Sequence, residues 1–289
     1  MKLKGINKFI EKIPKFSGKK IILLPFYLLS VLIVSLLIQL LFDILPTILP
    51  TDGVLGFVLP WFPIFGVLMM GIIAIFLVYQ MWFHRDRLKA KYNQLSYQKV
   101  FLAGFGGVVV IFSIVIHDYI AFYAWNIEFW SQFPYSVFAI SLNSYLSPIA
   151  LFLEYLRLIC GLFLGILGIL MALRALFTFG FDYMTVVYLY FPEESELQDH
   201  KIYSILRHPT YAGAIIICLG GAVLQLTLYS IIFFFILYFG MLIHIHFVEE
   251  KELISRFGDS YKDYRENVPA FFVRPRNWGQ FFKFIIGKE

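Results

Sequence analysis

Runs of apolar residues long enough to cross a membrane set the strongest limit on how this chain folds. The hydrocarbon core of a bilayer is about 30 Å thick, which a helix of roughly 20 apolar residues spans. Four such runs lie at about 21–46, 54–83, 100–124 and 148–178. A further run at 210–247 is broken near its middle by Gln225, Thr227, Tyr229 and Ser230, which predicts a tight hairpin of two short spans. With 60% hydrophobic and 15% charged residues, the chain is predicted to be all-α: a polytopic membrane helix bundle with about six spans.

The lysines and arginines lie at alternate ends of these predicted spans. The first twenty residues contain seven lysines and the loop at 84–99 contains three lysines and two arginines, whereas 47–53 and 125–147 contain neither residue type. Because basic loops stay on the cytoplasmic side of a membrane, both termini and both polar clusters described below are expected to face the cytoplasm. Contact with anionic lipids accounts for the net charge of +5, so we expect membrane lipids as partners and no nucleic acid.

One membrane domain with three parts is expected. Residues 1–20 form a basic cytosolic arm, 21–147 form N-terminal spans that carry no functional motif and act as an accessory, and 148–289 form the core with its C-terminal cap. Within this cytosolic helical cap, 249–268 is predicted to be one amphipathic helix that folds over the end of the bundle. The aromatic and basic residues at 278–288 suit a short helix on the membrane surface.

The first polar cluster is the heptapeptide at the start of the hairpin, Arg207-His208-Pro209-Thr210-Tyr211-Ala212-Gly213. Pro209 fits the first turn of a helix, because it lacks an amide hydrogen and its φ is already near the helical value. The positive end of that helix then lies beside the Arg207 guanidinium, an arrangement that attracts a carboxylate or a phosphate. A histidine before a proline is by itself more often a capping or surface residue, so the second cluster decides its interpretation.

The second cluster lies where the hairpin leaves the membrane and contains His244, His246, Glu249 and Glu250. Adjacent carboxylates at a membrane boundary are costly unless they are solvated or paired; they are also explained as the solvated start of a cytosolic helix. The two histidines point to different faces of a helix, so joint metal ligation is not expected, and interface placement and substrate contact both remain open. The cysteines lie singly in apolar runs, and no metal site is predicted.

These clusters belong to one longer pattern. In order, the chain contains Arg-His-Pro-x-Tyr-x-Gly at 207–213, a hydrophobic hairpin, Glu-Glu-x-x-Leu-x-x-x-Phe-Gly-x-x-Tyr-x-x-Tyr at 249–264, and Val268-Pro269. This order and spacing resemble the isoprenylcysteine carboxyl methyltransferase family over about 175–275. The resemblance implies an integral-membrane methyltransferase that takes S-adenosylmethionine from the cytosol and modifies a lipophilic acceptor entering from the bilayer.

The resemblance also implies roles for individual residues. By motif position, the cofactor-binding residues are Tyr203, His208, Pro209, Thr210, Tyr211 and Glu249, with Glu249 holding the charged amino-acid end. The catalytic candidates are Arg207, which orients an anionic substrate or the cofactor carboxylate, and Glu250. The substrate-binding candidates are His244 and His246. Methyl transfer from a sulfonium is an in-line displacement, so positioning and desolvation supply much of the catalysis, and a carboxylate nucleophile needs no general base.

One departure from the family pattern leaves the methyl acceptor open. The family often has an arginine four residues before the first glutamate to bind the substrate carboxylate, and here that position is Ile245. Carboxyl O-methylation of a prenylcysteine-like substrate is the first expectation. A phospholipid N-methyltransferase or a small-thiol S-methyltransferase is the alternative. A sterol-type reductase, which carries a similar Arg-His-Pro, and a non-catalytic lipid-binding membrane protein are alternatives of another class.

Overall fold

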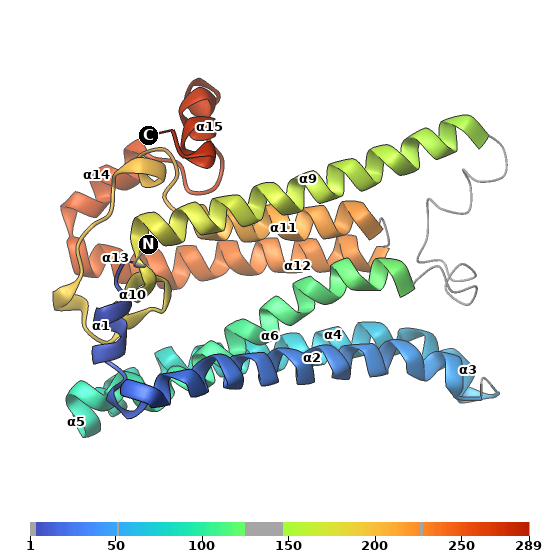
Figure 1. Cartoon of the computed structure of the whole chain (residues 1–289), viewed down its shortest axis with the longest axis horizontal. Coiled ribbons are helices and arrows are strands. Elements are labelled where there is room, and N and C mark those ends of the chain that lie inside the picture. Colours follow the sequence, from blue (N-terminus) through green and yellow to red (C-terminus); the bar gives the residue numbers. More distant parts are fainter. Residues whose placement is uncertain (1–3, 51, 125–146, 226–227, 289) are drawn as a thin grey trace. The chain divides into compact units, whose positions relative to one another are not determined.

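The computed structural model describes residues 4–50, 52–124, 147–225 and 228–288. In these residues all regular secondary structure is helical (Figure 1). The chain divides into two compact units, which we describe separately. Unit 1 consists of residues 1–9, 151–224 and 230–289, and unit 2 of residues 10–150 and 225–229.

Unit 2 is built on the long helices α2 (Leu23–Ile48), α4 (Phe62–Phe83) and α6 (Ser96–Ala124). The short helices beside them are α3 (Val54–Val58) and α5 (Arg85–Tyr92). The three long helices pack against one another pairwise and run side by side in Figure 1. Their apolar side chains bury only part of their surface, as expected for helices that face lipid.

Polar side chains connect α2 to α6 inside unit 2. Gln39 Nε2 donates to Ser113 Oγ at 3.0 Å, and one helical turn further on Asp43 Oδ2 lies 2.7 Å from His117 Nε2. Both pairs are buried. Since lipid offers no hydrogen-bonding partner, such contacts stabilise one alignment of two membrane helices.

Unit 1 is built on α9 (Ser147–Phe179), α11 (Pro209–Gln225) and α12 (Leu228–His244). α11 ends at Gln225 and α12 begins at Leu228, so the predicted break in the apolar run falls between two helices. Beyond α12 the chain continues through a π-helical turn, Ile245–Glu249, into α13 (Glu250–Phe257). Then follow α14 (Asp259–Asn267) and α15 (Trp278–Ile286).

Among the described residues, five helical segments are long and apolar enough to cross a membrane. They are Gly18–Pro46, Phe62–Phe83, Arg85–Ile120, Tyr155–Phe179 and Phe233–Phe257. The shorter apolar helix Pro209–Gln225 lies between the last two along the chain. The predicted all-α, polytopic membrane bundle is therefore confirmed. The apolar helix Pro209–Gln225 is short for a span.

Two glycines allow α9 and α11 to approach closely. A Cβ atom at Gly168 would lie 2.5 Å from the carbonyl oxygen of Gly213, and one at Gly213 would lie 2.8 Å from that of Gly168. Neither position has room for a side chain, because the nearest atoms belong to a backbone. Small residues at a membrane helix contact increase van der Waals packing between the two backbones, and this contact places the start of α11 against α9.

We expect Gly168→Leu to destabilise unit 1 by about 1–3 kcal/mol, because the added side chain forces α9 and α11 apart. Thermal unfolding of the detergent-solubilised protein measures this effect. Gly240→Leu on α12 is the matched control, since a Cβ atom there meets nothing within 4 Å. Equal losses of stability in the two variants would contradict the close contact.

The predicted single helix at 249–268 is wrong in one respect. The chain forms two helices, α13 and α14, which are separated at Gly258, where φ is +59°. This backbone conformation is open to glycine and strained for other residues. The break turns α14 back, so that the Tyr264 hydroxyl donates to the carbonyl of Tyr203 at 2.6 Å. The cap therefore folds over the end of unit 1 through a turn that apolar periodicity did not predict.

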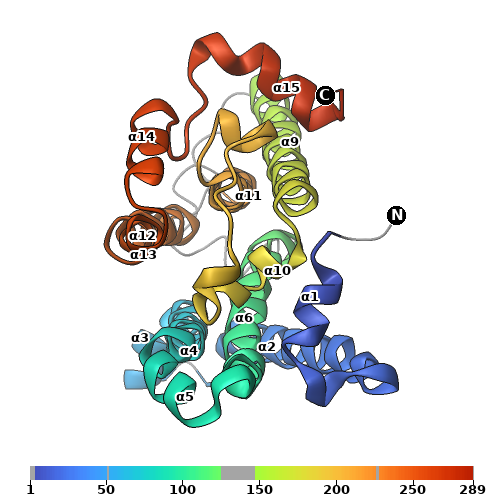
Figure 2. The same ribbon diagram turned by 90° about the vertical axis from the view of Figure 1, so that its left-hand side faces the viewer.

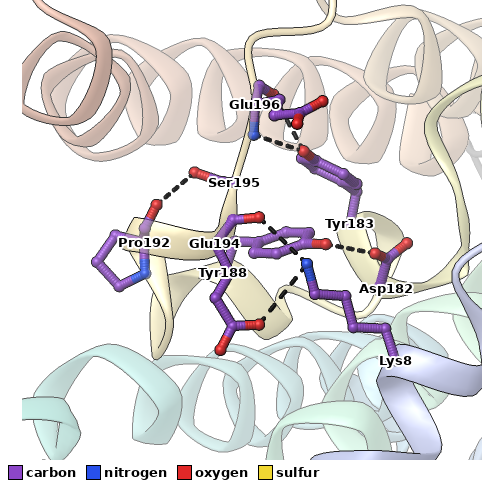
Figure 3. A network of polar contacts seen from close by, with 8 residues as sticks. All are labelled: Lys8, Asp182, Tyr183, Tyr188, Pro192, Glu194, Ser195 and Glu196. Carbon is purple, nitrogen blue, oxygen red and sulfur yellow. Dashed lines mark hydrogen bonds and ion pairs between the residues drawn. The ribbon is translucent and has the colours of Figure 1, made fainter.

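The beginning of the basic arm packs on unit 1 rather than remaining free. Lys8 Nζ donates to the carbonyl of Glu194 at 3.2 Å and lies 3.6 Å from a carboxylate oxygen of the same residue (Figure 3). It also lies 4.9 Å from the ring centroid of Tyr188, whose hydroxyl donates to Asp182. These contacts hold the loop between α9 and α11 against the arm.

Candidate active site

Two backbone hydrogen bonds draw the end of the cap to the start of α11. The amide of Arg207 donates to the carbonyl of Pro269 at 2.9 Å, and the amide of His208 donates to that of Ala270 at 3.1 Å. Pro209 then begins α11, as its missing amide hydrogen favours. The chain that follows α14 therefore runs beside the Arg-His-Pro segment, which places α13 and α14 next to it.

A buried ion pair joins the two polar clusters. Arg207 Nη1 lies 2.9 Å from Glu250 Oε1, and the two side chains are only 10% and 9% exposed. From α14, Arg265 Nη1 lies 3.7 Å from the second oxygen of the same carboxylate. Tyr261 is buried nearby, and burial raises the pKa of its hydroxyl. Two guanidinium groups thus face a single buried carboxylate.

His208 lies between the two adjacent glutamates. Its Nδ1 is 3.6 Å from Glu249 Oε1, and its Nε2 is 3.6 Å from Glu250 Oε1. Burial by itself lowers the pKa of His208, but the two carboxylates outweigh burial and hold the pKa above its ordinary value. The imidazole is therefore biased towards its charged form, which offsets part of the negative charge of the glutamates.

The raised pKa of His208 predicts a pH-dependent stability. The contribution of the protonated ring is complete below its unfolded pKa of about 6.5 and is lost as pH rises through the higher folded value. We therefore expect the melting temperature of the wild type to exceed that of His208→Gln most at pH 5.5 and least at pH 8.5. A difference that stays constant or grows with pH would show that the ring is not held in its charged form.

Several buried polar atoms of this cluster have no hydrogen-bond partner among the described residues. They are Nε and Nη1 of Arg207, Nε2 of His208 and Oε2 of Glu249. The 2.9 Å contact of Arg207 with Glu250 is thus an ion pair without hydrogen-bond alignment. Buried polar groups are rarely left unpaired. Guanidinium donors suit a carboxylate, and a carboxylate acceptor suits an ammonium, so the free atoms fit a ligand with an amino-acid group.

Tyr203 and Thr210 lie beside this cluster. The Tyr203 ring is buried and packs on Phe179 with the ring centroids 4.8 Å apart. Burial raises the pKa of its hydroxyl, so the phenol stays neutral, and Thr210 is its hydrogen-bonding neighbour. Thr210 Oγ1 also lies 3.5 Å from Met184 Sδ. These side chains provide an aromatic and weakly polar surface next to the charged groups.

The structure separates the two histidines of the second cluster. The ring of Tyr211 on α11 lies between two histidine rings. Its centroid is 5.8 Å from that of His208 and 6.3 Å from that of His244. His244 therefore belongs to the same group of side chains. His246 is exposed, and its ring lies against Phe247 at 4.8 Å. The π-helical turn shifts the residues that follow α12, and Ile245 is buried within it.

Sequence reasoning missed two residues of this group. Arg265 contacts Glu250, and the ring of Phe271 lies 6.1 Å from that of His208. Tyr264 belongs to the longer pattern, but its hydrogen bond to the carbonyl of Tyr203 was not predicted. Arg265 directly follows Tyr264 on the helix expected to cover the site, and this position was the available signal.

A membrane helix bundle with a buried charged cluster at one end of its spans is the class of protein that these features define. Residues 156–260, from α9 into α14, match the family model described as phospholipid methyltransferase. The matched segment carries both polar clusters, so this part of the chain is similar to that methyltransferase family.

Two named relatives give a narrower assignment. A protein-S-isoprenylcysteine O-methyltransferase of Schizosaccharomyces pombe is 38% identical over 69 residues, which are 24% of this chain and 29% of that protein. Protein-S-isoprenylcysteine O-methyltransferase B of Arabidopsis thaliana is 29% identical over 110 residues, 38% of this chain and 56% of that protein. The predicted resemblance to this family is therefore confirmed for the segment. The chain spans about a third to a half of the length of these relatives, and no solved structure matches it.

Proposed function

We propose that this protein is an integral-membrane methyltransferase that uses S-adenosylmethionine and methylates the carboxylate of a prenylcysteine-like acceptor. The observation that carries the proposal is the buried group of Arg207, His208, Glu249 and Glu250. Its donors and its acceptor that lack a hydrogen-bond partner match the charged groups of an amino acid, and it lies inside the segment that matches the methyltransferase family.

The cofactor, when bound, supplies a methyl group activated by a sulfonium. Glu249 accepts hydrogen bonds from its ammonium group, while His208 and Arg207 stabilise its carboxylate. The faces of Tyr203 and Tyr211 suit the positive charge of a sulfonium. Pro209 and Thr210 complete the cofactor-binding side of the site through the backbone and hydroxyl at the start of α11.

The chemistry at the acceptor depends on positioning. A carboxylate is already an adequate nucleophile, so the protein needs to hold it in line with the methyl group and to exclude water. The guanidinium of Arg207, which Glu250 holds in place at 2.9 Å, orients that carboxylate or the cofactor carboxylate. His244 faces the site and is the better placed of the two histidines to contact the acceptor.

The acceptor is proposed to be lipophilic and to enter from the bilayer. The site lies at one end of long apolar helices, and the sequence orientation puts this end and both termini on the cytoplasmic side. A water-soluble methyl donor and a membrane-bound acceptor can then reach the same place. Residues 21–147 are proposed to be an accessory to this core.

Purified protein supplied with labelled S-adenosylmethionine and a farnesylated cysteine analogue tests the proposal. We expect cofactor binding in calorimetry and a labelled product from which mild base releases the methyl group as methanol, because an ester forms. Absence of both binding and transfer to any lipidic acceptor would refute the function.

A second candidate is a phospholipid N-methyltransferase or a thiol S-methyltransferase. It is favoured by Ile245, which is buried where the family often has an arginine, and by the name of the matching family model. Nitrogen and sulfur products keep their methyl group in mild base, so the same labelled product distinguishes the candidates.

A further inference from the structure

We propose that α15 is an interfacial helix that inserts one apolar face into the membrane leaflet beside the site and binds anionic phospholipid headgroups. The helix has two apolar faces. Phe281 and Ile285 are buried in a cluster with Ile202, Ile205 and Leu206 of unit 1. Trp278, Phe282 and Ile286 recur every four residues and are 57%, 49% and 62% exposed. An exposed apolar stripe of this size is costly in water, and packing within unit 1 does not cover it.

The depth of α15 follows from its contact with α9. Arg174 Nε donates to the carbonyl of Ile285 at 3.1 Å, and Met171 and Ala175 lie in the same buried cluster. The span formed by α9 ends at Phe179. Arg174 therefore lies about 7–8 Å inside the end of that span, at 1.5 Å per residue. A helix bonded at this level lies at the boundary between headgroups and acyl chains.

The direction of α15 agrees with this depth. Figures 1 and 2 show α15 running across α9 rather than along it. Since α9 crosses the membrane, the axis of α15 lies close to the membrane plane. This is the orientation of a monotopic amphipathic helix, whose apolar face enters the acyl-chain boundary by about 5–10 Å.

The charges around α15 select the kind of lipid. Residues 272–288 contain four basic side chains, Arg274, Arg276, Lys283 and Lys288, and no acidic one. Arg276, Lys283 and Lys288 are exposed. Successive residues of an α-helix are rotated by about 100° around its axis. Lys283 therefore lies beside the exposed apolar stripe, and Gln280 lies on another face, roughly 160° from Phe282. Basic residues next to a buried apolar stripe favour phosphate headgroups with net negative charge.

Fluorescence quenching in nanodiscs tests the insertion on the full-length chain. An environment-sensitive dye is attached at Phe282→Cys or, as the matched control, at Gln280→Cys, after Cys160 and Cys218 have been replaced by alanine. Nitroxide-labelled phospholipid should quench the dye at 282 at least about threefold more than at 280, because only the first faces acyl chains. Equal quenching at both positions, or none at 282, overturns the proposal.

Headgroup selection is tested with the same dye at 282. At equal mole fraction, nitroxide-labelled phosphatidylglycerol should quench at least about twofold more than nitroxide-labelled phosphatidylcholine, because each basic residue enriches anionic lipid. The double variant Arg276→Gln and Lys283→Gln should lose this preference, whereas Lys262→Gln on α14 should keep it. No preference in the parent protein, or one that the double variant retains, refutes the anionic partner. Neither readout uses methyl transfer, so both are independent of the proposed function.

Discussion

Glu249→Gln is expected to weaken the binding of S-adenosylmethionine by at least about tenfold to a hundredfold, the largest single effect on the proposed activity. Hydrogen bonds that involve a charged group contribute about 1.5–3 kcal/mol, and each 1.4 kcal/mol corresponds to about tenfold in affinity. Glutamine keeps the shape of the side chain but presents no negative charge to the ammonium group of the cofactor. It also removes the charge that His208 faces at 3.6 Å. Isothermal titration calorimetry on the purified protein measures the change.

The matched control for this variant is Glu252→Gln. Glu252 lies on α13 within one turn of Glu249 but pairs with Arg256 at 3.3 Å. We expect its cofactor affinity to equal that of the wild type. If Glu249→Gln binds the cofactor normally while its melting temperature is unchanged, the carboxylate does not hold the amino-acid end, and the proposed orientation of the cofactor is wrong.

Arg207→Gln is expected to cost about 3–5 kcal/mol of stability, the largest effect on the fold, because it leaves the buried Glu250 carboxylate without its closest partner. The two groups are 2.9 Å apart, and about nine-tenths of each is buried. Arg265 at 3.7 Å can compensate only in part. The double variant Arg207→Gln and Glu250→Gln should recover much of the loss, since it removes both charges. Thermal or denaturant unfolding in detergent of Arg207→Gln, Glu250→Gln and the double variant, each compared with the wild type, gives the three values needed for a double-mutant cycle.

An exposed ion pair of nearly the same length serves as the control. Lys262 Nζ lies 2.8 Å from Asp259 Oδ1, but the two side chains are 51% and 89% exposed. Lys262→Gln should leave the melting temperature unchanged, because water stabilises both separated charges. If the double variant at 207 and 250 is as unstable as Arg207→Gln, burial of an unpaired charge is not the cause of the loss.

The parts of this protein that were predictable depend on local signals. Span positions follow from hydropathy over about 20 residues, and the hairpin turn follows from the polar residues between 225 and 230. The start of α11 at Pro209 follows from the chemistry of one residue. The longer pattern of motifs indicated a resemblance to a methyltransferase family, and the segment 156–260, which contains its first half and most of its second half, matches such a family.

The parts that were missed depend on pairs of distant residues. Gly258 was included in one long helix, since a glycine inside an apolar pattern does not reveal whether its φ is positive. The pairing of Arg207 with Pro269 and of His208 with Ala270 joins segments about sixty residues apart. The attachment of Lys8 to Glu194 joins segments farther apart still. No local pattern encodes which of several basic residues will meet a given carboxylate.

By itself, the sequence determined that this chain is a helical membrane protein, where its long apolar helices lie, and which family its C-terminal half resembles. These properties follow from hydrophobicity and from backbone chemistry within a few turns of helix. Only the tertiary structure decided which charges are buried together, that His244 rather than His246 faces the cluster, and that α15 lies across α9. The physical reason is that burial and pairing arise when helices pack, and a π-helical turn or a single glycine is enough to redirect every side chain that follows.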